Sequence, residues 1–240
     1  MIELGSATLA TPLCVALDSN DRSQILKTAE ATQPHAGMFK VGLTAFATLG
    51  PDLVRELRDL RPVFVDLKLH DIPAQVSGAV SAVAGSGAAM TTVHASGGAE
   101  MIAAAVAASR QADGFTVAAV TVLTSLDADA LREIGLGEDP ADTVGRLADV
   151  AVRAGAGALV CSPLEAEALR ARFGSRAQGG PVLVVPGVRP ADSRPADQRR
   201  TSTPRAAIGA GADILVVGRP ITSAPDPGTA ARKVLEEIEA

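Results

Sequence analysis

The run VFVDLKLHD, residues 63–71, holds the side chains best suited to acid–base or electrostatic chemistry. Side chains alternate between the two faces of a strand, so Asp66 and Lys68 should point one way and Val65, Leu67 and Leu69 the other. Lys40 in MFKVG and Asp18 at the end of VALD lie in or directly after other short apolar runs. If these runs lie side by side, four charged residues meet in one small volume, where burying charge is costly unless it is paired or used.

Three interpretations of this charged cluster are open. The first is a structural ion-pair network, because buried opposite charges can simply neutralise each other. The second is a divalent metal site, and its candidate ligands are Asp18, Asp66, His70 and Asp71. Lys40 and Lys68 argue against a metal, since each already supplies the positive charge that a metal would bring. The third, a functional site, is favoured because a structural pair rarely needs two lysines and three carboxylates at strand ends.

The elements that must position the cluster alternate along the whole chain. Short β-rich apolar runs alternate with amphipathic or Ala-rich segments, which is typical of repeated βα units around a parallel sheet. The expected strands are 13–18, 38–42, 63–69, 91–95, 116–123, 158–161, 182–186 and 214–218. The expected helices are 21–32, 44–60, 73–85, 99–112, 142–154, 163–173, 204–210 and 227–239.

Eight such units predict one (β/α)8 TIM barrel, a single α/β domain over residues 1–240. An open doubly wound sheet is the alternative, but no GxGxxG turn follows the first strand and the number of units favours closure. In a barrel, Asp66 and Lys68 would point inward near the end where the strands stop, which is where active sites form. The charged stretch RPADSRPADQRRTST, about 189–203, follows the seventh strand and is expected to be a lid on that face.

Composition excludes several classes of partner. Hydrophobic residues make up 47% of the chain and aromatic residues only 2%, so the core must be aliphatic. The net charge is −5 and no long basic run occurs, which argues against nucleic acid.

Cys14 and Cys161 lie in apolar runs and are expected to be buried thiols in a reducing compartment. No signal peptide and no apolar stretch long enough to span a membrane is recognisable, so we expect a cytoplasmic protein.

The string DLKLHDIP, residues 66–73, matches the DxKxxDIP motif of orotidine 5′-monophosphate decarboxylase. The chain resembles the bacterial form of that family nearly end to end. The other matching strings, in the family's order, are VALD, FKVG, TVHASGG, TVLTS, PGVRP, DQRR and VVGRPI.

The resemblance implies a carboxy-lyase of de novo pyrimidine biosynthesis. It would remove the C6 carboxylate of orotidine 5′-monophosphate, giving uridine 5′-monophosphate and carbon dioxide, without a metal or an organic cofactor. Lys68 would stabilise the C6 carbanion and then protonate it, while Asp66 and Asp71 keep Lys68 charged and aimed. The resemblance gives catalytic roles to Lys68, Asp66, Asp71 and Lys40.

The resemblance also implies a homodimer, in which Asp71 and the neighbouring Ile72 reach the active site of the partner subunit. The substrate-binding residues carried over are Asp18, Lys40, Asp66, Ile72, Thr124, Arg189, Gln198, Gly218 and Arg219. Among them, Asp18 and Lys40 would hold the ribose hydroxyls, and Thr124 would contact the pyrimidine. Gly218, Arg219 and Gln198 would hold the phosphate, with Gln198 in the loop that closes over it. Arg189, at the base of that loop, could equally be a surface charge that anchors it.

Two rival functions remain open. Sugar-phosphate decarboxylases and aldolases share the barrel and a DxKxxD motif but use magnesium; their second strand supplies a glutamate, where this chain has Lys40. The other rival is a noncatalytic barrel that binds a nucleotide phosphate, because fold alone does not prove chemistry. The intact set of Lys40, Asp66, Lys68 and Asp71 weighs against it, since a mere binder has no need to bury that much charge.

Overall fold

The computed structural model describes residues 2–4, 7–137, 139–190 and 202–239. Eight parallel strands close into a barrel in the order β10-β3-β4-β5-β6-β7-β8-β9. They are β3 (Leu13–Ala16), β4 (Met38–Gly42), β5 (Val63–Leu69), β6 (Met90–His94), β7 (Thr116–Val120), β8 (Ala158–Val160), β9 (Val182–Pro186) and β10 (Ile214–Val217). The predicted TIM barrel is therefore confirmed. Among the strands, the largest boundary error is at β7, expected to end at 123 and found to end at Val120.

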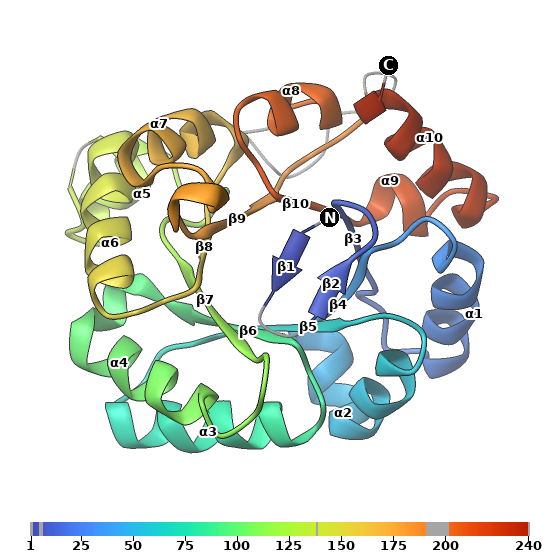
Figure 1. Ribbon diagram of the computed structural model, residues 1–240, viewed down its shortest axis with the longest axis horizontal. Helices are drawn as coiled ribbons and strands as arrows, with labels where there is room; N and C mark the ends of the chain where they lie inside the picture. Colours follow the sequence, from blue (N-terminus) through green and yellow to red (C-terminus); the bar gives the residue numbers. More distant parts are fainter. Residues whose placement is uncertain (1, 5–6, 138, 191–201, 240) are drawn as a thin grey trace.

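Helices form a ring around the barrel (Figure 1). They are α1 (Arg22–Thr32), α2 (Leu43–Arg58), α3 (Pro73–Gly85), α4 (Gly98–Ser109), α5 (Ala128–Glu133), α6 (Pro140–Arg153), α7 (Pro163–Phe173), α8 (Pro204–Gly209), α9 (Arg219–Thr222) and α10 (Pro227–Glu239). Side chains that cap the helix N-termini explain where several of these helices begin. Asp21 accepts hydrogen bonds from the backbone of Ser23 and Gln24, and Ser162 forms a capping box with Glu165. The short helices α5 and α9 were not expected from the sequence, since each is too short to show a periodic pattern.

The core has two layers, as the alternation of side chains along the strands requires. One layer lies between the strands and the helices and includes Val65, with Leu67 and Leu69 packed against it. The other fills the barrel interior and includes Met38 and Phe64. As the composition predicted, aliphatic and alanine side chains dominate both layers.

An N-terminal hairpin, which the sequence reasoning missed, closes one end of the barrel. Its strands are β1 (Ile2–Leu4) and β2 (Ala7–Leu9), and Figure 1 shows them across the middle of the ring. Leu4 and Leu9 are buried in the same cluster as Met38 and Met90, the first residues of β4 and β6. The hairpin thus covers the end at which the strands begin and leaves the opposite end for a site.

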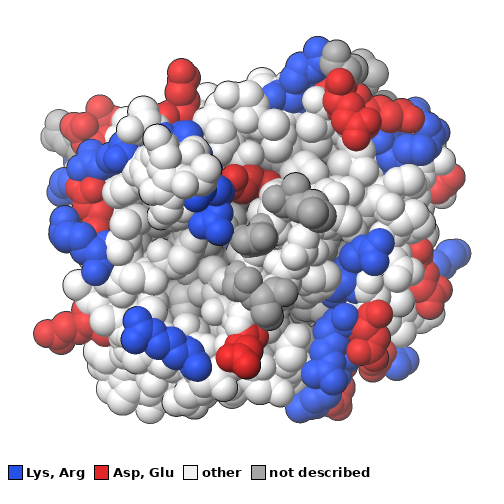
Figure 2. Space-filling model, in the orientation of Figure 1, with Lys and Arg blue, Asp and Glu red and all other residues white. Residues whose placement is uncertain are grey.

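The charge on the hairpin face is mixed. Figure 2 shows basic and acidic side chains interspersed around its periphery, and the residues described on this face form no broad patch of one sign. Within the described residues, no helix is both long and apolar enough to cross a membrane.

Candidate active site

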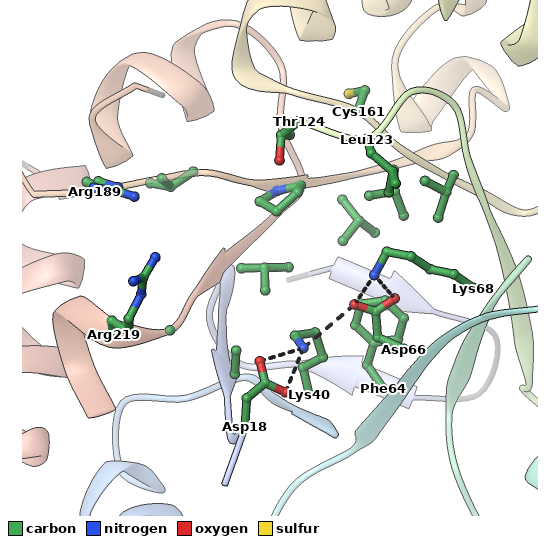
Figure 3. A pocket seen from close by; sticks show the side chains of 18 of the residues that line it. Asp18, Lys40, Phe64, Asp66, Lys68, Leu123, Thr124, Cys161, Arg189 and Arg219 are labelled. Atoms are coloured by element: carbon green, nitrogen blue, oxygen red, sulfur yellow. Dashed lines mark hydrogen bonds and ion pairs between the residues drawn. The ribbon is translucent and has the colours of Figure 1, made fainter. Parts of the chain in front are cut away.

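A cavity of about 450 Å³ lies at the end of the barrel where the strands stop, with charged side chains along one side (Figure 3). Its lining includes these residues singled out from the sequence: Asp18, Lys40, Asp66, Lys68, Thr124, Arg189, Gly218 and Arg219. They come from β3, β4, β5, β7, β9 and β10 or from the segments directly after these strands. Residues far apart in the sequence are brought together because parallel barrel strands all end on the same face.

Four charged side chains form an alternating series along this cavity. Lys40 Nζ lies 3.0 and 3.1 Å from the two carboxylate oxygens of Asp18. It lies 3.6 Å from Asp66 Oδ2 on its other side. Lys68 Nζ then donates to both oxygens of Asp66 at 2.9 Å. Each interior member, Lys40 and Asp66, is flanked by two groups of opposite sign, so their mutual attraction offsets the cost of burial.

Burial and charge act in opposite directions on the two buried members. Burial alone would raise the pKa of Asp66, but the Lys40 and Lys68 ammonium groups outweigh it and hold that pKa below its usual range. Burial alone would lower the pKa of Lys40, but Asp66 and Asp18 outweigh it and raise that pKa. Both groups therefore stay ionised near neutral pH, and the cavity carries fixed charges of both signs.

The backbone that presents Lys68 is irregular. Its φ of 53° makes it the one non-glycine residue with positive φ among those the structure describes. The pairing of β5 with β6 also shifts register between Val65 and Leu69, which marks a β-bulge. The bulge redirects Asp66 and Lys68, and positive φ in a non-glycine residue is uncommon and costs energy.

Glycine at position 42 leaves room for the series. A Cβ atom added there would lie 2.2 Å from Asp18 Oδ1 and 2.9 Å from Lys40 Nζ. Gly42 is thus where the β4 backbone comes close to the Asp18–Lys40 ion pair, and a larger residue would push that pair apart.

Comparisons with known proteins agree with this geometry. Residues 11–234 match the model of the Orotidine 5'-phosphate decarboxylase / HUMPS family. The chain belongs to this family. An orotidine 5'-phosphate decarboxylase of Anaeromyxobacter sp. (strain K) is 54% identical over 92% of this chain and 96% of that protein. The enzyme of the same name from Thermobifida fusca (strain YX) is 50% identical over 96% of this chain and 97% of that protein.

A solved structure supports the same family relationship. The crystal structure of an orotidine 5'-phosphate decarboxylase from Lactobacillus acidophilus superposes with a TM-score of 0.83 and is 36% identical. The match covers 96% of this chain and 100% of that chain. The whole barrel, and not only the motif at residues 66–73, is therefore shared with members of the family.

The side of the cavity that faces the charged series in this family member is apolar, and the sequence reasoning missed it. Its residues lie in or directly after β7, β8 and β9: Val120, Val122, Leu123, Val160, Cys161, Val184 and Pro186. In the sequence these apolar residues cannot be told apart from residues of the barrel core. Only the closed barrel shows that they border a cavity. Arg189 and Arg219 face the cavity from one flank and Lys68 from the opposite flank (Figure 3).

Cys161 borders the cavity and is buried, as is Cys14, as the apolar runs around them predicted, and neither takes part in a disulfide bond. Burial raises the pKa of the Cys14 thiol, which keeps it protonated in the barrel interior.

Two described residues from the sequence prediction, Asp71 and Ile72, do not line this cavity. Asp71 is exposed, and its carboxylate accepts a hydrogen bond from the Ile72 backbone at 2.7 Å. The Ile72 side chain is 63% exposed, next to the start of α3. Gln198, with most of the expected lid, lies outside the described residues.

Among the parts of the chain that the structure describes, no group of three or more His, Cys, Asp and Glu side chains is placed to hold a metal ion. The carboxylates of Asp18 and Asp66 are instead engaged by the two lysines.

Proposed function

We propose that this chain is a cytoplasmic orotidine 5′-phosphate decarboxylase of de novo pyrimidine biosynthesis. It converts orotidine 5′-monophosphate into uridine 5′-monophosphate and carbon dioxide. The observation that carries the proposal is the alternating series Asp18, Lys40, Asp66, Lys68 inside the cavity of a chain that belongs to this family.

The chemistry needs a cation beside the reacting carbon. Loss of carbon dioxide leaves an electron pair at C6 of the pyrimidine, and a preplaced ammonium stabilises that charge as it forms. Lys68 supplies the ammonium and then donates a proton to C6, forming the C–H bond of the product. Asp66 holds Lys68 through two 2.9 Å hydrogen bonds, so the ammonium is in place before the reaction begins.

The rest of the cavity binds the other parts of the substrate. Asp18 and Lys40 hold the ribose hydroxyls, and Thr124 contacts the pyrimidine. Arg219, together with the backbone at Gly218, binds the phosphate at the far flank from Lys68, with Arg189 beside it. The same proposal gives a phosphate contact to Gln198, which lies outside the described residues. This arrangement uses the binding energy of a nonreacting group to organise the reacting one.

The same proposal includes a homodimer in which Asp71 and Ile72 enter the partner's active site. In one subunit Asp71 lies outside the cavity lining and is exposed. Ile72 is 63% exposed and Leu43, at the start of α2, is 58% exposed. Exposed large apolar side chains beside an active-site face support burial against a second copy of the chain.

The activity test uses purified protein treated with a metal chelator. The loss of the substrate's ultraviolet absorbance is followed for wild type, for Lys68→Ala and for Lys27→Ala, which removes an exposed lysine from α1. Wild type and Lys27→Ala should turn over, while Lys68→Ala should lose a factor of about 10³ or more in kcat. If the chelated wild type is inert towards orotidine 5′-monophosphate but acts on a sugar phosphate once magnesium is added, the protein is instead a magnesium-dependent sugar-phosphate decarboxylase or aldolase.

The dimer test mixes two inactive variants, Lys68→Ala and Asp71→Ala. If Asp71 acts across the interface, each hybrid dimer has one site with both residues intact, and a 1:1 mixture should regain about a quarter of wild-type activity. If Asp71 acts within its own chain, or if the protein is monomeric, mixing restores nothing.

A further inference from the structure

Thr92, the third residue of β6, is wholly buried and does not line the cavity, yet it contacts both charged residues of β5. Its hydroxyl accepts a hydrogen bond from the backbone N–H of Lys68 at 2.8 Å. The same hydroxyl donates to Asp66 Oδ1 at 2.9 Å. Because an N–H group can only donate, the hydroxyl proton must go to Asp66, so both bonds have a fixed direction.

The position of Thr92 opposite the bulge explains this double contact. Val65 pairs with Thr91 and Leu69 pairs with Val93, so residues 66–68 of β5 face Thr92 alone on β6. A bulge leaves backbone groups outside the regular ladder of the sheet. The Thr92 hydroxyl accepts the hydrogen bond from the Lys68 N–H. Lys68 is also the residue whose φ of 53° is uncommon for any residue other than glycine.

We propose that Thr92 is a positioning residue for the decarboxylation: its hydroxyl ties the backbone of Lys68 to the carboxylate of Asp66 and so fixes where the ammonium meets the substrate. This inference rests on the function proposed above for Lys68 and Asp66. A single group that holds both the main chain of one residue and the side chain of the other leaves the pair little freedom to rotate. Small displacements of such groups have large effects on rate.

The charge state of Asp66 depends on the same contact. Burial alone would raise its pKa, and the hydrogen bond from Thr92 acts with Lys40 and Lys68 to lower it. Removing the hydroxyl therefore weakens one of the contacts that keep Asp66 ionised and paired with Lys68.

Thr91 offers a matched control. It precedes Thr92 in β6, is equally buried, and its hydroxyl also donates to β5, to the carbonyl of Val65 at 2.8 Å. It makes no hydrogen bond to either charged residue. Thr91→Val and Thr92→Val thus remove the same atoms from neighbouring buried sites, and only the second touches the charged pair.

The experiment measures kcat and KM for orotidine 5′-monophosphate together with unfolding followed by circular dichroism. We expect Thr92→Val to lower kcat on the order of ten- to a hundredfold, the loss that follows from removing one hydrogen bond to a charged group. KM should change little, because the groups proposed to bind ribose and phosphate are not in contact with Thr92. Thr92→Ser keeps the hydroxyl and should recover most of kcat, while Thr91→Val should stay within about twofold of wild type in kcat.

A purely structural role predicts a different result. If Thr92→Val and Thr91→Val lose similar stability and both keep kcat, or if Thr92→Ser is as slow as Thr92→Val, the assignment is overturned. Should the valine variant not fold, comparing Thr92→Ser with Thr92→Ala isolates the hydroxyl in the same way. Lys68→Ala separates this inference from the proposed function: if that variant remains active, both fail, whereas an inactive Lys68→Ala beside an unaffected Thr92→Val refutes the role of Thr92 alone.

Discussion

Replacing Asp66 by asparagine keeps the shape of the side chain but removes the negative charge that lies between two lysines. In the folded protein, Asp66 accepts two 2.9 Å hydrogen bonds from Lys68 and lies 3.6 Å from Lys40. At an effective dielectric constant of about 20, Coulomb's law gives about 6 kcal/mol of attraction at the first distance and about 5 kcal/mol at the second. Much of this attraction is offset by the cost of removing the carboxylate from water.

The net loss expected for Asp66→Asn is about 3–5 kcal/mol in the free energy of unfolding, the range for breaking a buried ion pair on one side. Lys40, which is buried, then faces Lys68 with no anion between them. Urea unfolding at pH 7, followed by far-ultraviolet circular dichroism, measures this loss. Circular dichroism is the suitable probe because the chain has no Trp and no Tyr whose fluorescence could be followed.

The control for this substitution is Asp129→Asn, which removes a carboxylate from an exposed pair with Arg132 at the start of α5. Exposed ion pairs contribute little, so this variant should unfold almost as wild type does. If Asp66→Asn were no less stable than Asp129→Asn, the attraction within the series would not exceed that of a surface pair. Mutual pairing would then not be what stabilises the buried charges.

Two further predictions concern the same series. First, stability should fall on both sides of neutral pH. The folded-state pKa of Asp66 is lowered, so its contribution is present above its ordinary value of 3.8 and is lost as the pH falls below that value toward the folded-state pKa. The pKa of Lys40 is raised, so its contribution is present below its ordinary value of 10.5 and is lost as the pH rises through the folded-state pKa. Urea unfolding across this pH range should show a smaller loss of stability at acid pH in Asp66→Asn than in wild type, and a smaller loss at alkaline pH in Lys40→Met. If Asp66→Asn lost as much stability at acid pH as wild type, the assignment of the acid loss to Asp66 would be contradicted. Second, Gly42→Ala should lower kcat/KM by about tenfold or more, since the added Cβ must displace Asp18 or Lys40. Gly209→Ala in α8, where an added Cβ meets nothing within 4 Å, should leave kcat/KM unchanged, and equal losses in the two variants would rule out the close approach at Gly42 as the cause.

Much of the fold could be predicted from the sequence because its signals are local and repeated. Strand runs such as 38–42 and 63–69 are bounded by clear changes in hydrophobicity, and β4 and β5 have these limits in the structure. The N-terminal hairpin escaped prediction because its two strands are three residues long and show no lasting alternation. Its role depends on burying Leu4 and Leu9 under the barrel, which only the closed fold reveals.

The charged side of the cavity could be predicted, but its apolar side could not. Lys40 and Asp66 are buried in the structure, and charged residues in buried strands attract attention because their burial is costly. Val184 and Cys161 have the same residue types as the barrel core, so nothing local separates a side chain that borders a cavity from one that fills the interior. That distinction depends on where the strands end relative to one another, which is a property of the register around the whole barrel.

The alternation of side chains along a strand predicted that Asp66 and Lys68 share a face, but the structure brings the two side chains together in another way. In a regular strand, two residues on the same face are spaced at about 6.6 Å along the chain, and their side chains run parallel. Here the strand bulges, Lys68 takes a positive φ, and its ammonium turns back onto the carboxylate of Asp66. No local sequence pattern predicts this conformation of Lys68, because positive φ usually selects glycine or asparagine and here the residue is a lysine. Such a conformation persists when surrounding contacts determine it, and in this protein those contacts come from the Thr92 hydroxyl and the Asp66 carboxylate. The geometry of Lys68 is therefore held by the fold against its local preference, which is the arrangement expected of a residue whose position matters for chemistry more than for stability.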